Sequence, residues 1–279
     1  MIINLISCIK CGKKIKKGQI MKRYFLFIFV FMITSILQAD VKKDSVTYND
    51  GDLELQGYFA HDQLLKAKRG GVLLIHDRNG HDAFIRERAD ELASLGYVVF
   101  ALDMFGKGIL AKDASGADDL VTPFLGENRQ LMRHRANLGF EILSQHKKVD
   151  PNRLAAVGYG FGGMAVLELV RSGQNIVAAV NFYGNLSTPT PEDAQNIKGS
   201  ILILHGSEDQ IVSQDEIAGF RLEMKDGNVD WQMNTYGGAF CGFSVYDHGF
   251  DTSEGRAYNY SADKRSWEAL KVMLREKLK

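Results

Sequence analysis

The chain has 279 residues, of which 45% are hydrophobic and 24% charged, with 28 glycines, four prolines and three cysteines. This composition excludes intrinsic disorder, a collagen-like repeat and a disulfide-stapled scaffold, and it is ample for a buried core. The formal net charge is zero, but residues 1–39 hold seven basic residues and no acidic one, which leaves 27 basic against 34 acidic residues in the remainder. Because phosphate binding needs a basic surface, we expect no nucleic-acid partner.

Residues 1–39 have the pattern of an N-terminal extension with a secretory signal peptide. Lys22 and Arg23 precede fourteen mostly apolar residues, and the small residue Ala39 follows. Fourteen residues rise about 21 Å as a helix, less than the ~30 Å core of a bilayer. We expect cleavage after Ala39, a periplasmic or secreted location, and no stable membrane anchor after cleavage; an uncleaved anchor is the alternative. Met21 directly precedes the basic residues of this pattern, so it is a candidate for the true start of translation, with residues 1–20 assigned from an incorrect upstream start.

Strand and helix patterns alternate from residue 40 onward, without an internal repeat or a linker. Continuous apolar runs at 71–76 and 201–205 are typical of strands buried on both faces. Repeated β-α units predict one α/β domain over 40–279, a mostly parallel sheet with helices on both faces. The predicted strands are 52–59, 71–76, 97–102, 153–157, 176–182, 201–205 and 231–236, and the predicted helices are 83–95, 127–147, 161–172, 213–225 and 262–277.

A glycine-rich turn follows the predicted strand 153–157 and allows two interpretations. As Gly-x-Gly-x-x-Gly, with Gly158, Gly160 and Gly163, it matches a dinucleotide-binding turn. That interpretation also needs an acidic residue about twenty residues later, and the strand end at 180–183 offers none. As Gly-x-nucleophile-x-Gly, with Gly160 at the nucleophile position and Gly162 after it, the turn matches a nucleophile elbow. The elbow is the favoured interpretation.

Two later segments support the elbow. Asp209 lies just after the buried strand 201–205, where an elbow hydrolase carries its acid, and residues 236–243 follow the last strand, where the histidine loop belongs. The order nucleophile, acid, base is that of α/β hydrolases.

From about residue 45 to the C-terminus the chain resembles the dienelactone hydrolase family, and it matches several of the family's motifs in order. The resemblance implies a single-domain α/β-hydrolase fold and hydrolysis of small carboxylic esters or lactones by a Cys–Asp–His triad. The matching segments are 76–80 (HDRNG), 85–89 (IRERA), 101–106 (ALDMFG), 158–163 (GYGFGG), 205–209 (HGSED), 236–243 (YGGAFCGF), 257–259 (AYN) and 263–267 (DKRSW).

Two of the three implied triad positions are substituted. The nucleophile position is Gly160 and the histidine position is Cys241, so only Asp209 matches. Glycine has no atom that can attack a carbonyl, and a thiol cannot relay protons near pH 7 as imidazole does. Asp77 also replaces the glutamate that usually follows the strand.

An oxyanion hole is still expected at this turn. Its donors are the backbone N–H groups of Arg78 and Phe161. His248 could substitute for the missing base, although an exposed loop histidine is the simpler interpretation. Cys241 is a weak candidate nucleophile, because the Asp209 carboxylate would suppress its thiolate.

The sequence thus leaves three hypotheses. The first is an exported, catalytically impaired hydrolase of small esters or lactones. The second is a non-catalytic protein that binds a small ester, lactone or related carbonyl ligand in the same pocket. The third, dinucleotide binding through the glycine turn, is disfavoured. We expect no cofactor and no metal site.

Overall fold

The computed structural model describes residues 39–64, 66–126 and 129–278. The expected signal peptide therefore lies almost entirely outside the described residues. Residues Ala39–Lys279 form one compact unit. Its elements, in chain order, are β1 (Val41–Asp50), β2 (Leu53–Asp62), β3 (Arg69–Ile75), α2 (Ala83–Ser94), β4 (Val98–Leu102), α3 (Ala114–Val121), η1 (Thr122–Leu125), α4 (Gln130–Ser144), β5 (Val149–Tyr159), α5 (Phe161–Arg171), β6 (Ala178–Phe182), η3 (Pro191–Asn196), β7 (Ser200–Gly206), α6 (Gln214–Asp226), β8 (Trp231–Tyr236), η4 (Tyr246–His248) and α7 (Tyr260–Lys277).

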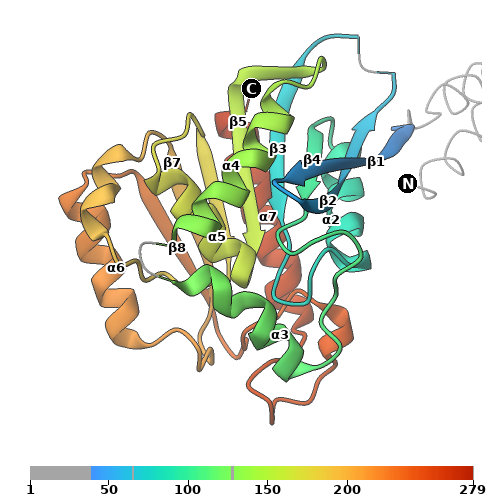
Figure 1. The fold of residues 1–279 in the computed structure, drawn as a ribbon. Helices are drawn as coiled ribbons and strands as arrows, with labels where there is room; N and C mark the ends of the chain where they lie inside the picture. The colour runs from blue at the N-terminus through green and yellow to red at the C-terminus, as the bar shows by residue number, and fades with distance from the viewer. Residues whose placement is uncertain (1–38, 65, 127–128, 279) are drawn as a thin grey trace, which may run out of the picture. The chain divides into compact units, whose positions relative to one another are not determined.

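The strands form one sheet in the order β1-β2-β4-β3-β5-β6-β7-β8. The pairings β1–β2 and β2–β4 are antiparallel, and every later pairing is parallel. Helices cover both faces, with α4 and α5 in front of the sheet in Figure 1 and α7 behind it. The predicted fold, a mostly parallel sheet within an α/β-hydrolase domain, is confirmed.

The sheet separates two hydrophobic cores, because successive residues of a strand point to opposite faces. In β3, Leu73 and Ile75 belong to the core beneath α4, α5 and α6, whereas Val72 and Leu74 belong to the core beneath α2 and α7. All four side chains are fully buried. Burial on both faces explains why the central strands are uninterrupted apolar runs.

The largest differences from the predicted elements lie at the edge and in the connections. β1 was not predicted, because its sequence is mostly polar and half of it is exposed. The predicted helix 127–147 begins at Gln130 and ends at Ser144, and α3, η1 and η3 were not predicted. β5 starts four residues before the predicted strand, and its pairing with β3 shifts register in that extension.

The parallel strands β3, β5, β7 and β8 all end at the same edge of the sheet. Ligand sites of such sheets lie outside the carboxyl ends of the strands. The segments after β3, β5, β7 and β8 are those in which the sequence places Asp77, Gly160, Asp209 and Cys241. Among the helices of the described ranges, none is long and apolar enough to cross a membrane.

Candidate functional site

Gly160 occupies a sharp turn between β5 and α5. Its φ is +52° and its ψ −115°, a left-handed conformation that favours glycine. The flanking positions are too crowded for a side chain: a Cβ on Gly162 would lie 2.2 Å from the carbonyl oxygen of Ile75. The glycines of this motif therefore allow a tight strand-to-helix turn, as the elbow interpretation requires.

Two main-chain amides beside this turn have no acceptor within the part of the chain that the structure describes. Phe161 is the first residue of α5, where N–H groups have no partner within the helix. Arg78 lies three residues after β3. Among residues 39–278, apart from 65, 127 and 128, no acceptor receives the backbone N–H of Phe161 or of Arg78. Both amides are therefore available to a ligand oxygen.

The residues predicted for the site surround one cavity of about 380 Å³. Asp77, Arg78, Gly160, Phe161 and Cys241 all line it. Asp209 does not, although Ile211, two residues later, does. The cavity is further lined by Asp118, Val121, Leu125, Arg129, Met164, Tyr183, Asn185, Ser187, His248 and Arg256.

Asp77 is a buried carboxyl group at the base of this cavity. It is 7% exposed, and its Oδ1 accepts a hydrogen bond of 2.7 Å from the backbone N–H of Asn79. Its Oδ2 has only a longer contact, 3.3 Å to the side-chain amide of Asn79. Burial raises the pKa of Asp77 to about 6, against the opposing effect of the Asn79 hydrogen bond.

Cys241 is buried in a setting that suppresses its thiolate. Burial, followed by the negative charge of Asp209, raises the pKa of the Cys241 thiol to about 12. The Sγ atom lies 3.8 Å from the carbonyl oxygen of Tyr183 and 3.6 Å from a guanidinium nitrogen of Arg256. The nearby Arg256 guanidinium lowers this pKa, but burial and Asp209 outweigh it, so the thiol stays neutral and is a poor nucleophile.

Asp209 has one satisfied oxygen and one without a partner. Oδ1 accepts from the backbone N–H groups of Ile211, at 2.8 Å, and Val212, at 3.2 Å. Oδ2 is buried and has no hydrogen-bond partner among the described residues. A buried carboxylate oxygen normally has a donor. Among the described residues no imidazole donates to this oxygen, and the position expected to carry the histidine is Cys241.

His248, the candidate replacement base, lies at the cavity wall. The structure makes it half-buried, in place of the exposed loop histidine that was the simpler expectation. Its Nδ1 is 3.2 Å from the carbonyl oxygen of Gly242, and burial is the first cause of its lowered pKa. Among the described residues no hydrogen bond joins His248 to Asp209 or Cys241.

Sequence reasoning missed several cavity residues, among them Arg129, Tyr183 and Arg256. Each lies in a connection outside the matched triad segments, and the fold brings it to the strand ends. Tyr183, directly after β6, is a non-glycine residue with positive φ (+43°). Such a conformation is costly for a side-chain-bearing residue and recurs at functional sites. One sequence feature could have identified Tyr183 as a site residue: it directly follows a predicted buried strand.

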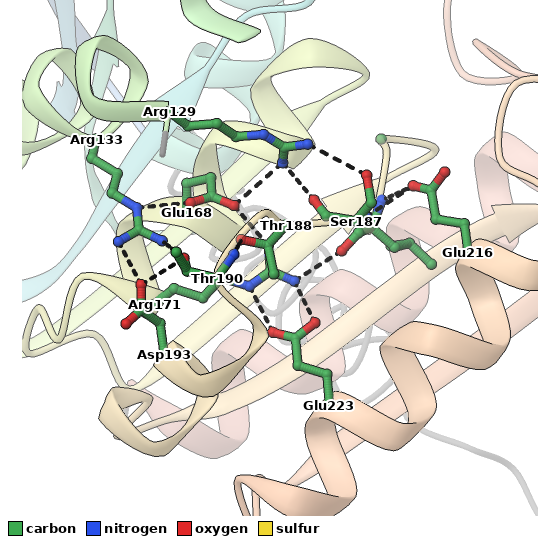
Figure 2. A network of polar contacts seen from close by, with 12 residues as sticks. Arg129, Arg133, Glu168, Arg171, Ser187, Thr188, Thr190, Asp193, Glu216 and Glu223 are labelled. Carbon is green, nitrogen blue, oxygen red and sulfur yellow. Dashed lines mark hydrogen bonds and ion pairs between the residues drawn. The ribbon is translucent and has the colours of Figure 1, made fainter. Parts of the chain in front are cut away.

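A buried ionic network supports the wall of the cavity (Figure 2). Arg171 makes two hydrogen bonds of 2.7 Å to Glu223, and Glu168 accepts from Arg133, Arg129 and Arg171. Arg129 also donates to the carbonyl oxygen of Ser187, and both residues line the cavity. The network thus ties α5 and α6 to the loop that forms part of the wall.

A larger depression of about 760 Å³ lies between η3 and α6. Glu192, Asp215, Glu216 and Asp226 make it acidic, and none of the predicted site residues lines it. Within the described ranges, no group of three His, Cys, Asp or Glu side chains is arranged to hold a metal ion. The 380 Å³ cavity, which has free amide donors and a buried carboxyl, is therefore the candidate site.

Comparisons with known proteins agree with the fold. A model of the dienelactone hydrolase family matches residues 55–278. Protein usf of Aquifex pyrophilus is 26% identical over 212 residues, covering 72% of this chain and 90% of that protein. The mouse carboxymethylenebutenolidase homolog is 23% identical over 159 residues, covering 57% of this chain and 63% of that protein. The crystal structure of a dienelactone hydrolase-like promiscuous phosphotriesterase from metagenomic libraries superposes with a TM-score of 0.81, at 31% identity, over 86% of this chain and 99% of that one.

Proposed function

The chain belongs to the dienelactone hydrolase family, and from this premise we propose that its cavity binds small carboxylic esters, lactones or related carbonyl compounds and hydrolyses them only slowly. The observation that carries the proposal is the pair of acceptor-free amides at Arg78 and Phe161, beside a turn that has no nucleophile. Two such donors suit a carbonyl oxygen that gains negative charge.

The substitutions at the triad support slow turnover. Gly160 has no attacking atom, and the buried thiol of Cys241, with a pKa raised to about 12, cannot act as a general base near pH 7. Enzymes stripped of their triad keep on the order of 10³-fold acceleration over water through the oxyanion hole and binding. Binding without turnover is the second candidate function, and the same two substitutions favour it.

Two measurements test this proposal. Hydrolysis of p-nitrophenyl acetate is followed with purified protein, with Asp209→Ala as a comparison, and binding of the matched amide 4-nitroacetanilide is followed by ligand-observed NMR. We expect saturable binding and a rate far below that of triad-bearing relatives. Robust turnover that is lost on changing His248, yet insensitive to substitutions at positions 160 and 241, would contradict the proposal of slow hydrolysis.

A pair of matched variants localises the binding. Ile211 lines the cavity and is 42% exposed, whereas Leu222 is 61% exposed on α6 and lies away from it. Ile211→Trp should block the mouth and weaken binding, and Leu222→Trp should leave it intact. Equal effects of the two variants would place the ligand elsewhere.

We further propose that the protein is exported, with a mature chain that begins at Asp40. The support is the sequence pattern of Lys22 to Ala39, together with a compact unit that starts at Ala39. N-terminal sequencing of the protein from fractionated native cells tests this. Protein in the soluble cell fraction that retains Met1 or Met21 would overturn the proposal.

A further inference from the structure

The missing nucleophile leaves a space beside Asp77. Apart from atoms of its two chain neighbours, a Cβ atom on Gly160 would have two atoms of the described residues within 4 Å: Cβ of Asp77 at 3.5 Å and a ring carbon of Tyr183 at 4.0 Å. The flanking Gly158 and Gly162, in contrast, have main-chain atoms within about 2 Å of the equivalent point. The volume directly above position 160 is therefore open, and it borders the side chain of Asp77.

The carboxyl group of Asp77 has bonding capacity left toward this space. Oδ1 is held by the Asn79 amide at 2.7 Å, which fixes the orientation of the group, whereas Oδ2 has only the 3.3 Å contact. A carboxylate oxygen accepts more than one hydrogen bond. A water molecule in the open volume would therefore find an acceptor in Oδ2.

The donors for a reacting carbonyl lie around the same space. Phe161 follows Gly160 directly and Arg78 follows Asp77 directly, and both have free amide N–H groups. Base and oxyanion donors thus come from the same two turns, after β3 and after β5. A carbonyl carbon held by these amides would lie next to a water at the vacated position.

We propose that Asp77 is the general base of this protein, activating a water molecule that takes the place of the missing nucleophile side chain. Asp77 accepts one proton from the water as the water oxygen forms a bond to the carbonyl carbon of the ester. The resulting oxyanion is held by the two amides. The bond to the alkoxide then breaks, and the alkoxide takes the proton from Asp77 to leave as the alcohol. This inference rests on the proposed binding of small esters.

The charges around Asp77 suit this role. Burial raises its pKa to about 6, so that the group is mostly ionised at pH 7 and is still a competent base. Asp82 raises this pKa further, and Arg256 and Arg78 lower it. Tyr183 and Cys241 also face Asp77 across the cavity, and the pKa of each is raised, so both are neutral at this pH.

The test is the pH dependence of p-nitrophenyl acetate hydrolysis by the full chain. We expect kcat/KM of the wild type to fall about tenfold per pH unit below pH 6, as Asp77 becomes protonated. Asp77→Asn should lower kcat by about 10²-fold or more and remove this acidic limb of the pH profile, the fall in kcat/KM below pH 6. The variant should still bind 4-nitroacetanilide. Asp77→Glu, which keeps a carboxylate at this position, should retain the acidic limb. Glu254 is an exposed residue outside this cavity, so Glu254→Gln controls for the loss of one negative charge.

The outcomes separate the two proposals. A wild-type rate with no limb near pH 6, or an Asp77→Asn variant that keeps both rate and limb, would overturn the role of Asp77 and leave the binding proposal standing. Binding of 4-nitroacetanilide without hydrolysis of the ester by the wild type would do the same. Loss of binding in the wild type itself would overturn the proposed function.

Discussion

A Cβ atom on Gly158 would lie 2.0 Å from the carbonyl oxygen of Gly162, so the two sides of the turn after β5 are in main-chain contact. Gly160, between them, is not crowded, because the nearest atom to its ideal Cβ is 3.5 Å away. Different factors therefore restrict the residue type at the three positions. Neighbouring main-chain atoms leave no room for a side chain at positions 158 and 162, whereas at position 160 only the φ of +52° disfavours one.

Gly160→Ala should therefore destabilise the protein by about 1 kcal/mol or more, because a side-chain-bearing residue pays roughly 1–2 kcal/mol in the left-handed region. Gly219, an exposed glycine within α6 with nothing within 4 Å of its ideal Cβ, is the matched control. Gly219→Ala should stabilise by about 0.5–1 kcal/mol. Urea melts at equal m-value measure both. An unchanged or higher midpoint for Gly160→Ala would argue against the elbow.

Restoring two residues of the triad should restore turnover only when both are present. Gly160→Cys alone should gain little, because no base deprotonates the new thiol. The double variant Gly160→Cys with Cys241→His should raise kcat/KM by at least about 10²-fold, since triad residues act as a unit. The imidazole would also give the buried Oδ2 of Asp209 the donor it lacks.

Asp209→Ala in that double-variant background is the control. It should remove most of the gain, because the imidazole then loses its orienting partner. A gain that survives the loss of Asp209 would show that the restored activity does not use the predicted triad.

Asp77 should make stability depend on pH in a defined direction. Its pKa is raised by burial from 3.8 to about 6, so the folded state binds the proton more tightly than the unfolded state. The associated stabilisation is fully present below pH 3.8 and is lost as the pH rises through 6. Asn does not titrate, so the stability of Asp77→Asn relative to wild type should rise by about 2 kcal/mol between pH 4 and pH 7. Urea melts across this pH range measure the difference in stability between the two proteins. A difference that does not change with pH would contradict the raised pKa of Asp77.

Replacing the acidic residue should destabilise the protein far more in the network around Glu168 than in an exposed ion pair of the same spacing. Glu168 and Arg171 are both fully buried and lie three residues apart on α5. Glu268 and Lys271 have the same spacing on α7, with Glu268 65% exposed. Glu168→Ala should cost about 3–5 kcal/mol, because three largely buried guanidinium groups lose the carboxylate that they share, whereas Glu268→Ala should cost about 0.5 kcal/mol or less. Comparable losses would mean that the network does not hold α5 to the cavity wall.

Cys241 should be inert to alkylation while the protein is folded. It is 2% exposed and its pKa is raised to about 12, so at pH 8 only about one thiol in 10⁴ is ionised. Peptide mass analysis after iodoacetamide treatment should find position 241 unmodified in native protein and modified in urea. Rapid labelling of native protein would reveal a reactive thiol and revive Cys241 as a nucleophile.

The elements predicted well include β3 and β7, which are continuous apolar runs, and β8, whose residues are of mixed polarity and burial. β8 matches the prediction residue for residue, and β3 and β7 differ from it by one or two residues at each end. β1 was missed because it is held by pairing with β2 along its whole length and not by an apolar face of its own. Its stability comes from a partner strand, which periodicity within one segment cannot reveal.

The candidate site was predicted in part for a similar reason. Motif order located Asp77, Gly160, Asp209 and Cys241, because each follows a strand that the sequence predicts. Arg256 lies far along a connection, and only the folded chain brings its guanidinium to 3.6 Å from the Cys241 sulfur. The partnerless Oδ2 of Asp209 was likewise beyond sequence reasoning, since local spacing does not determine whether a buried atom finds a donor.

The two free amides at Arg78 and Phe161 have an evolutionary consequence. Because both are main-chain groups fixed by the turns after β3 and β5, a point mutation can replace their side chains without removing either donor. Catalytic side chains can be lost by single substitutions, while the two donors proposed to bind a polarised carbonyl are inherited with the fold. A lineage that has lost its nucleophile therefore keeps a template on which hydrolysis can evolve again.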